Sequence, residues 1–516
     1  MTCSAEIASL ADRTRHAYRR REPEKTLLYR ILQQHLETFL ARTDERGGLP
    51  WFVRRELRSF LACGLLCYGF ARVHCSSCGK DMLVGFSCRG RGFCPSCGAR
   101  RMSDTAAHLV DHVLPHVPVR QWVLSLPYQI RFRLASRKAL LCEVRRIVLR
   151  RILAFMRRLA KEHGYDRAQS GAVTSVQRFN SALGLDVHLH CLVLDGVFTQ
   201  ASTTARPVFH DTRAPTTLEV ARLALSIRKQ VLRLLHARGF SFDSSEPELD
   251  MSEDEDALLA ACQAASVQGR IALGNDAGKP VVRIGRGPGG AKVRVAGERC
   301  ADVEGFSLHC DVRVPGRERS RLERLARYVL RPALATERLT ETGDGRVAYH
   351  FKNPWRDGST HVVFTPQVFL ERLAALIPPP RAHLVTYHGV LAPGAALRDL
   401  VVPAPPRRKN RSDNRPSQDD RLVQRLKVRN LPDYQRRYPW SELLLRVFLE
   451  DVLKCPCGAR RKLIALITDP PVVTAILKSL GLATQPPAVC AARPPPALEL
   501  QPTFEEETPP QDSSPN

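Results

Sequence analysis

The sequence lacks several features that would each place it in a common class of protein. Its 516 residues contain no run of about eighteen apolar residues, which a membrane-spanning helix requires. Residues 1–21 mix charges and have no apolar core segment of the kind found in secretory signal peptides. There is also no P-loop pattern, G-x-x-x-x-G-K followed by Ser or Thr, and no internal repeat. We therefore expect a cytoplasmic protein in a reducing compartment, with no membrane span and no P-loop nucleotide site.

Acidic residues are scarce relative to basic ones. The chain has 78 lysines and arginines against 52 aspartates and glutamates, a formal net charge of +26, and the excess is spread along most of its length. Such a charge favours a nucleic-acid partner over a protein that is merely basic. Hydrophobic residues make up 44% of the chain, so large cores can form, and the length suggests roughly three domains or more.

The cysteines form a pattern that is typical of a metal site. Sixteen cysteines in a sequence that we expect to be reduced favour metal ligands over disulfides. Two C-x-x-C pairs, Cys75 with Cys78 and Cys94 with Cys97, are separated by residues 79–93, and a glycine follows each pair. Four thiolates at this spacing suit tetrahedral zinc, and a redox dithiol pair or unliganded core thiols are the alternatives. We predict one structural zinc ion bound by Cys75, Cys78, Cys94 and Cys97.

Other residues near this segment are weaker candidates. Cys88 and His74 are spare metal ligands, and Cys455-Pro456-Cys457 is a C-x-C pattern to which we assign no zinc. A group of arginines in the same segment favours contacts with phosphate: Arg89, Arg91, Arg100 and Arg101.

Residues 185–198, LDVHLHCLVLDGVF, form the most informative predicted strand. Alternation places Asp186, His188, His190 and Leu192 on one face and aliphatic residues on the other. Two imidazoles side by side can share a divalent cation, and a metal beside a phosphate can polarise its oxygens for attack. The alternative is a pair of ordinary half-buried histidines.

The order of the predicted elements indicates an α+β fold. Strands at 119–134 and 171–180 flank a long helix at 136–163 and precede the histidine strand. The connection at Gly184 is too short for a parallel crossover, so we expect an antiparallel sheet. Further elements are expected as helices at 26–42, 51–66, 216–239, 366–376 and 440–452, a hairpin around 356–358, and a strand at 383–390.

The chain is predicted to divide into successive segments. These are an N-terminal helical region at 1–66, a zinc-binding domain at 67–104, a catalytic domain at 105–345 with its C-terminal part at 346–402, a basic linker at 403–439, a small helical region at 440–482 and a disordered tail at 483–516. The linker contains a basic run at 407–411. An acidic run at 253–256 is most simply a solvated loop, with a metal site as the alternative.

A predicted helix at 315–332 presents a tyrosine among arginines. Arg321, Arg324, Tyr328 and Arg331 lie three or four residues apart on one face. A phenol is a poor nucleophile unless positive charge or a metal-polarised phosphate assists it. Tyr328 is therefore a candidate nucleophile, and the alternative is a tyrosine that packs at a domain edge.

Four blocks of the sequence resemble, in order, the HUH rolling-circle transposases of bacterial insertion sequences. The relevant branch joins a zinc-binding domain to a tyrosine transposase domain. The resemblance spans residues 25–470 and implies an HUH-type antiparallel sheet with flanking helices, preceded by a small helical and zinc-ribbon-like domain. The blocks are HCSSCGKDMLVGFSCRGRGFCPSCGARRM, QRFNSALGLDVHLHCLVLDGVF, RLERLARYVLRP and WRDGSTHVVFTPQVFLERLAALIPPPRAHLVTYHGVLAP.

The resemblance implies an endonuclease and strand transferase for single-stranded DNA. His188 and His190 match the His-hydrophobe-His motif and would hold Mg²⁺ or Mn²⁺. Tyr328 matches the nucleophile, which would form a 5′-phosphotyrosyl intermediate. The implied partners are single-stranded DNA and hairpins at the ends of the element, together with host replication proteins. The residues expected to bind DNA are Arg321, Arg324, Arg331, Arg89 and Arg91.

The sequence departs from the family in two places. Cys455-Pro456-Cys457 is C-x-C where relatives tend to show C-x-x-C, and Arg324 stands where many members have a second tyrosine. The chain thus resembles the single-tyrosine relatives associated with common-region elements. A third metal ligand is expected, and Gln177 or Asn180 could supply it.

Two other classes of protein stay open at this point. One is a zinc-dependent DNA-binding regulator without catalysis. The other is a two-metal nuclease, although Asp186, Asp195 and Asp357 show no spacing that pairs them.

Overall fold

The computed structural model describes residues 21–202, 204–240, 257–285, 297–355, 357–403, 438–448 and 451–494. The acidic run at 253–256, the basic run at 407–411 and the tail beyond residue 494 lie outside the described residues. In the described part, no helix is both long enough and apolar enough to cross a membrane.

The N-terminal region is helical, as predicted. It contains η1 (Pro23–Lys25), α2 (Leu27–Asp44), α3 (Trp51–Phe60) and η2 (Leu66–Tyr68). The Thr26 hydroxyl accepts a hydrogen bond from the Tyr29 amide and caps α2. Helix α3 is shorter than predicted, because the chain turns after Phe60 and Gly64 adopts a φ of +86°. This turn directs Cys63 toward other cysteines.

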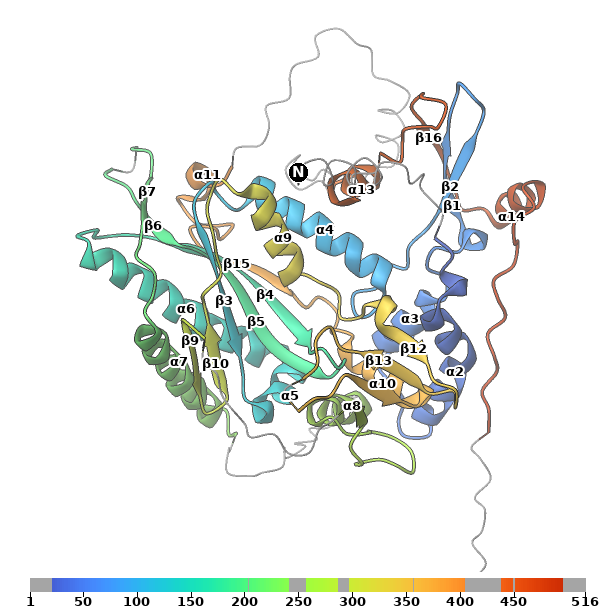
Figure 1. The fold of residues 1–516 in the computed structure, drawn as a ribbon, viewed down its shortest axis with the longest axis horizontal. Coiled ribbons are helices and arrows are strands. Elements are labelled where there is room, and N and C mark those ends of the chain that lie inside the picture. The colour runs from blue at the N-terminus through green and yellow to red at the C-terminus, as the bar shows by residue number, and fades with distance from the viewer. Residues whose placement is uncertain are drawn as a thin grey trace, which may run out of the picture.

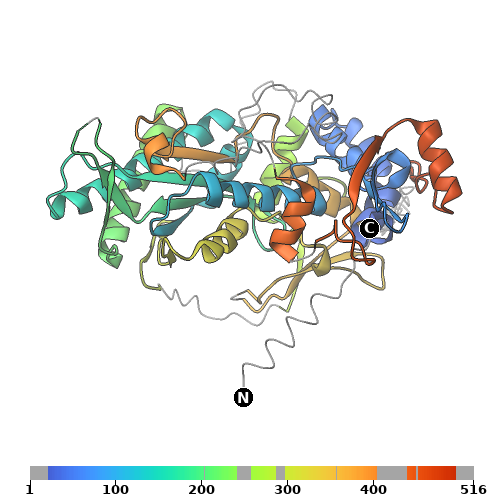
Figure 2. The same ribbon diagram turned by 90° about the horizontal axis from the view of Figure 1, so that it is seen from above.

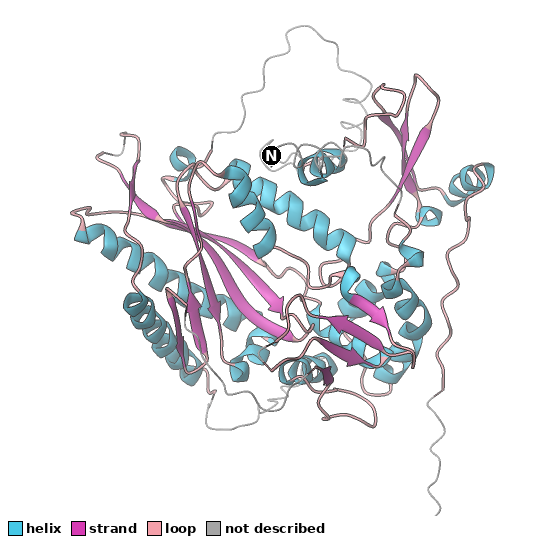
Figure 3. Cartoon of the chain, in the orientation of Figure 1, coloured by secondary structure: helices cyan, strands magenta, loops and turns pink. Residues whose placement is uncertain are grey.

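A central antiparallel sheet forms the middle of the molecule (Figures 1 and 3), which confirms the α+β prediction. The strand order is β15-β4-β5-β3-β10-β9, and β11 also pairs with β3. The strands are β3 (Val119–Ser125), β4 (Gly171–Phe179), β5 (Leu185–Leu194), β9 (Cys300–Val303), β10 (Phe306–His309), β11 (Arg313–Val314) and β15 (Val385–Gly389). A separate two-stranded sheet is formed by β6 (Gly196–Thr199) and β7 (Val208–Asp211).

Helices cover both faces of the central sheet (Figure 1). One face packs against α6 (Lys138–Glu162) and α7 (Thr217–Ala237), and it includes the aliphatic side of the histidine strand. The other face packs against α4 (Pro95–His112) and α9 (Arg319–Val329). The histidines of β5 therefore face the layer that contains α9.

The predicted strand at 119–134 is wrong in its second half. Strand β3 ends at Ser125, and α5 (Tyr128–Ser136) follows with Pro127 at its N-cap. Ile130 and Leu134 are four residues apart and both fully buried, a spacing typical of one face of a helix. The same sequence also alternates, so its pattern alone fits either a helix or a strand. Burial against α6 and β5 decided for the helix.

A second, smaller layer lies beside the N-terminal helices. Its sheet has the strand order β12-β13-β14-β8 and includes the predicted hairpin. The predicted helix at 366–376 belongs to the same layer. The layer contains α8 (Ala257–Gln268), β8 (Val282–Ile284), η3 (Thr336–Arg338), β12 (Leu339–Glu341), β13 (Val347–His350), β14 (His361–Phe364) and α10 (Pro366–Leu376). Residues of α8, β12, β13, β14 and α10 share one hydrophobic core with α2 and α3. Helix α11 (Arg398–Val401) packs in a different core, together with α4 and α9.

The C-terminal segment returns to the N-terminal region. Strand β16 (Lys462–Ile467) pairs antiparallel with β1 (Phe70–His74), which pairs in turn with β2 (Asp81–Gly85). Figure 2 shows this C-terminal segment, in red, against the blue N-terminal elements. Two helices complete it, α13 (Trp440–Phe448) and α14 (Pro470–Ser479). Residues 440–482 are thus joined by a sheet to the zinc-binding region.

Candidate catalytic and metal sites

The two histidines of β5 lie on the same face of the sheet, as predicted. Their ring centroids are 5.0 Å apart. The His188 side chain is 12% exposed and His190 is 3% exposed, so water has little access to either ring. The pair forms the floor of a site beneath α9.

The hydrogen bonds of the two rings decide which ring nitrogens have a free lone pair. His188 Nδ1 lies 3.0 Å from the Asp186 carbonyl oxygen, which can only accept, so Nδ1 bears the proton and Nε2 has a free lone pair. His190 Nδ1 lies 2.8 Å from the side-chain amide of Gln121. His190 Nε2 is buried with no hydrogen-bond partner among the described residues. The contacting atom is Gln121 Nε2, which donates to Nδ1, so the ring proton of His190 lies on Nε2 in this arrangement. A turn of the Gln121 amide that places its oxygen at Nδ1 would free the Nε2 lone pair for a metal.

Burial keeps both rings uncharged near neutral pH. Desolvation, with the neighbouring His188 and Arg331 adding to it, lowers the pKa of His190 to about 3. Desolvation also lowers the pKa of His188. Neutral imidazole is the form that binds metal ions, so the site needs no deprotonation at neutral pH.

Gln177 lies directly opposite His188 in the register between β4 and β5. Its side-chain NH₂ donates to the Val329 carbonyl at 2.7 Å and to the Tyr328 carbonyl at 3.4 Å. Its Oε1 is buried and has no partner among the described residues. Gln177 therefore holds the end of α9 on the sheet and offers an oxygen on the histidine face.

Asn180, the other candidate for a third ligand, has a structural use. Its Oδ1 accepts hydrogen bonds from the backbone amides of Ala182 and Gly184, both at 2.9 Å. These bonds shape the turn between β4 and β5. Gln177 is the better candidate.

Tyr328 lies in the last turn of α9 and faces the histidine pair. The centroids of the Tyr328 and His190 rings are 6.0 Å apart, and the rings are perpendicular. The Arg331 guanidinium carbon lies 4.5 Å from the Tyr328 ring centroid. Tyr328 is 51% exposed, so its hydroxyl is accessible from solvent above the buried histidines.

The predicted DNA-binding arginines have different environments. Arg324 is exposed and lines a pocket of about 730 Å³ formed by α4, α9 and α13. Arg321 is exposed and paired with Glu318. Arg89 is exposed, with a φ of +58°. Arg91 is half-buried and donates to a backbone carbonyl of residue 382, so in this structure it joins the zinc-binding region to the rest of the chain.

The aspartates do not form a two-metal site. Asp195 lies between Arg120 and Arg313, with oxygen to nitrogen distances of 2.7 and 2.8 Å. Asp186 pairs with Arg131 at 3.2 Å. Asp186 and Asp195 stand at opposite ends of β5, and an extended strand of that length separates them by roughly 30 Å. The carboxylate nuclease has no support in the described residues.

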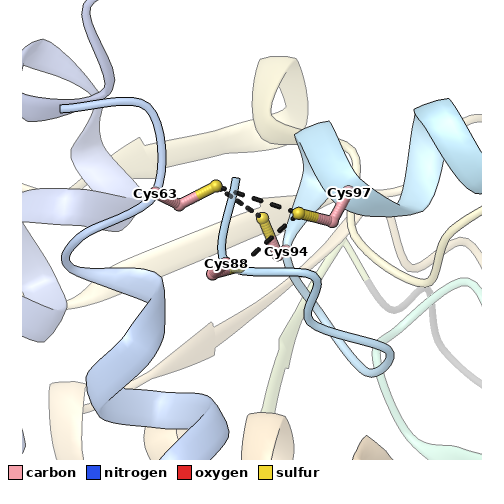
Figure 4. A group of neighbouring side chains, drawn as sticks. All are labelled: Cys63, Cys88, Cys94 and Cys97. Carbon is pink, nitrogen blue, oxygen red and sulfur yellow. Dashed lines mark hydrogen bonds between the residues drawn. The ribbon is translucent and has the colours of Figure 1, made fainter. Parts of the chain in front are cut away.

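The cysteines correct the prediction of a single zinc site at Cys75, Cys78, Cys94 and Cys97. The two C-x-x-C pairs lie in different clusters. Cys94 and Cys97 converge with Cys63 and Cys88, which we name the first cysteine cluster (Figure 4). The second cysteine cluster is Cys75, Cys78, Cys455 and Cys457.

The first cysteine cluster has the dimensions of a metal site. Sulfur to sulfur distances are 3.6 Å for Cys63 with Cys94, 3.8 Å for Cys63 with Cys97 and 3.5 Å for Cys88 with Cys97. Tetrahedral zinc with bonds of about 2.3 Å places its sulfurs about 3.8 Å apart. Hydrogen bonds from Cys88 and Cys94 lower the pKa of Cys63 to about 7, which favours a thiolate.

The two clusters contain four cysteines that the sequence analysis does not predict as zinc ligands. Cys88 was only a spare candidate, Cys63 was not considered, and Cys455 with Cys457 had been left without zinc. His74, the other spare candidate, pairs with Asp81 at 2.8 Å instead. The signal that could have found Cys455 and Cys457 is the glycine after them, which repeats the Cys-Gly ending of both C-x-x-C pairs.

The two glycines after the C-x-x-C pairs serve different purposes. Gly79 has a φ of +69°, a conformation that permits the tight turn after Cys78. Gly98 lies inside α4, and a Cβ there would come 2.7 Å from Cβ of Pro332. Gly98 therefore allows the chain after α9 to pack closely against α4.

Comparison with known families gives two matches. The family described as "Putative transposase" matches residues 171–398, which include the histidine strand and α9. The family described as "Transposase zinc-binding domain" matches residues 31–126, which include the whole first cysteine cluster. Searches of curated proteins and of solved structures gave no match.

Both matches are to transposase domains, in this order on one chain, and together they support a transposase of the insertion-sequence type. The zinc-binding domain and the cysteine clusters support structural zinc.

Proposed function

We propose that this transposase cleaves and rejoins single-stranded DNA by transesterification at Tyr328, as HUH rolling-circle enzymes do. The observation that supports this most is the position of Tyr328, whose half-exposed ring faces the ring of buried His190 at 6.0 Å. A nucleophile reachable by DNA thus stands over a pair of neutral imidazoles.

The residues below Tyr328 fit a divalent cation. His188 Nε2 and Gln177 Oε1 offer lone pairs on one face of adjacent strands. His190 Nε2 would offer a third lone pair after the Gln121 amide turns its oxygen toward Nδ1. The amide oxygen suits both Mg²⁺ and Mn²⁺, and the imidazole nitrogens favour Mn²⁺ over Mg²⁺, which prefers oxygen ligands. Such an ion, when bound, would polarise the oxygens of the scissile phosphate.

In the proposed reaction, Tyr328 Oη attacks phosphorus and loses its proton to solvent. The bond between phosphorus and the 3′ oxygen breaks, and the 3′ oxygen takes up a proton. The products are a 5′-phosphotyrosyl link and a free 3′ hydroxyl. A second 3′ hydroxyl reverses the step, so the energy of the phosphodiester is retained and no ATP is required.

Positive side chains around Tyr328 suit a DNA backbone. Arg331 stands over the tyrosine ring, where its charge can stabilise the phosphate during attack. Arg324 lies one helical turn earlier and is exposed. Because Arg324 occupies the place of a second tyrosine, we propose that each chain forms one covalent link at a time.

The test is cleavage of a labelled single-stranded oligonucleotide from the end of the element, with Mn²⁺ or Mg²⁺, on a denaturing gel. Wild type should give a protein-linked DNA band, and Tyr328→Phe should abolish both this band and cleavage. Tyr68→Phe is the matched control, because Tyr68 is similarly exposed at 52% but lies in η2. Equal cleavage by wild type and Tyr328→Phe would refute the role of Tyr328. Binding without cleavage by wild type would favour a regulator instead.

A further inference from the structure

The second cysteine cluster brings together residues from opposite ends of the chain. Cys75 and Cys78 lie in the turn between β1 and β2, while Cys455 and Cys457 lie just before β16. The sulfur of Cys75 is 3.6 Å from that of Cys457, and the sulfur of Cys78 is 3.5 Å from that of Cys455. These separations are close to the roughly 3.8 Å between thiolates on one tetrahedral zinc ion.

Each of the two turns of this cluster is closed by the amide of a glycine, over four residues in one turn and three in the other. The Gly79 amide donates to the Cys75 carbonyl at 2.9 Å, and the Gly458 amide donates to the Cys455 carbonyl at 2.9 Å. Both glycines have positive φ angles, +69° and +89°. Each turn presents its two thiols toward the other turn, although one is C-x-x-C and the other is C-x-C.

The three-stranded sheet around this cluster has a small hydrophobic core, which contributes little to its stability. The sheet has only the strands β16, β1 and β2. Units of this size commonly require a metal or a disulfide for stability. The buried residues of this core are Leu66, Phe70, Leu83, Val473 and Leu477.

We propose that Cys75, Cys78, Cys455 and Cys457 bind a second structural zinc ion, which fastens the C-terminal segment to the N-terminal zinc-binding domain. Four thiolates close the coordination shell, so this ion has no open position for catalysis. The zinc-binding domain is then discontinuous in sequence. Residues 31–126, the part matched by the family of zinc-binding domains, supply only half of this site.

Fastening at this point has a structural consequence for the whole C-terminal segment. Arg446 of α13 donates to Asp111 of α4 at 2.8 Å and to Glu323 of α9 at 2.8 Å. The segment also contacts the molecule through β16 on β1, through α14 on η2 and through residues 488–493 on α2. The second zinc ion secures the contact made by β16.

The test measures zinc per full-length chain, purified under reducing conditions, by inductively coupled plasma mass spectrometry. Wild type should contain two zinc ions, and Cys455→Ser/Cys457→Ser should contain one. Cys490→Ser is the matched control, because Cys490 is exposed, follows α14 and belongs to neither cluster. This variant should retain two zinc ions.

A second measurement keeps the proposal testable if the variant is unstable. Titration of wild type with a thiol-binding mercurial should release zinc in two stages, and hydrogen exchange at β16 should rise with the loss of one of them. A single zinc ion in wild type, or two in Cys455→Ser/Cys457→Ser, would overturn the proposal. Disulfides linking Cys75 or Cys78 to Cys455 or Cys457 in the protein as purified would also overturn it.

Discussion

Replacing Gln177 separates two roles that the structure gives to one amide. Its NH₂ group holds the end of α9, and its Oε1 is a buried acceptor without a partner among the described residues. Gln177→Met preserves the length and volume of the side chain and removes both functions. Gln177→Glu preserves an oxygen and removes the N–H donors.

The effect on stability follows from the two hydrogen bonds. The bond to Val329 at 2.7 Å is of ordinary strength, and the contact with Tyr328 at 3.4 Å is weak. Gln177→Met leaves one well-buried carbonyl without a donor, which costs about 1–3 kcal/mol. The free energy of unfolding, measured in urea, should fall by this amount, and Gln177→Glu should lose at least as much.

The effect on metal binding distinguishes the two variants. Gln177→Met should raise the Mn²⁺ concentration for half-maximal cleavage by about 10–100-fold, the range seen when groups supporting a metal are removed. Gln177→Glu should retain metal-dependent cleavage at lower Mn²⁺ than Gln177→Met, because it keeps an oxygen ligand.

A control variant shows which result would refute this reasoning. Gln263→Met changes another buried glutamine, in α8, and should leave the Mn²⁺ requirement unchanged. If Gln177→Met also has the wild-type Mn²⁺ requirement, Gln177 is not a metal ligand. If its unfolding free energy is unchanged, the bond to α9 contributes nothing to stability.

Three further changes test the packing around the site. Asp195→Asn leaves the buried guanidinium of Arg120 without its charged partner and should lower the unfolding free energy by about 3–5 kcal/mol in a urea titration. Burial raises the pKa of Glu371 to about 7, so the folded state binds more protons than the unfolded state between about pH 4.5 and 7, and stability falls as pH rises through this window. Glu371→Gln should remove this fall in stability. The difference in unfolding free energy between Glu371→Gln and wild type should therefore rise in favour of the variant by about 2–3 kcal/mol between pH 5 and pH 8. Gly98→Ala introduces a Cβ at 2.7 Å from Pro332 and should cost about 1–3 kcal/mol and slow cleavage by displacing the end of α9.

Each of these predictions has a matched control. Asp344→Asn changes an aspartate in an exposed ion pair and should change stability little; equal effects of the two aspartate variants would contradict the burial argument. Glu337→Gln, at an exposed position, keeps Glu371, so its stability relative to wild type should not change between pH 5 and pH 8. Gly394→Ala adds a Cβ where no atom lies within 4 Å, so destabilisation as large as that of Gly98→Ala would exclude the contact with Pro332 as the cause.

The sequence by itself determined the elements in which local pattern and burial agree. Alternation in 185–194 was enough to place His188 and His190 on one face, because successive side chains of a strand point to opposite sides. The helix at 366–376 has the predicted bounds, with Pro366 at its first turn and a capping threonine before it. Helical spacing also predicted arginines near Tyr328, and the structure places Arg331, just after the end of α9, over the Tyr328 ring.

Only the tertiary structure decided which distant residues meet. The spacing of Cys75, Cys78, Cys94 and Cys97 predicted one zinc site, yet each pair completes its cluster with cysteines elsewhere in the chain. A tetrahedral site requires four thiols at one point in space and places no limit on the chain between them. The same reason applies to Gly98, where a side chain would collide with Pro332, a residue far away in the sequence. It also applies to residues 128–134, because their alternating pattern did not exclude a helix and burial against other elements selected one. Local periodicity specifies the direction of a side chain, while its partner depends on the path of the whole chain.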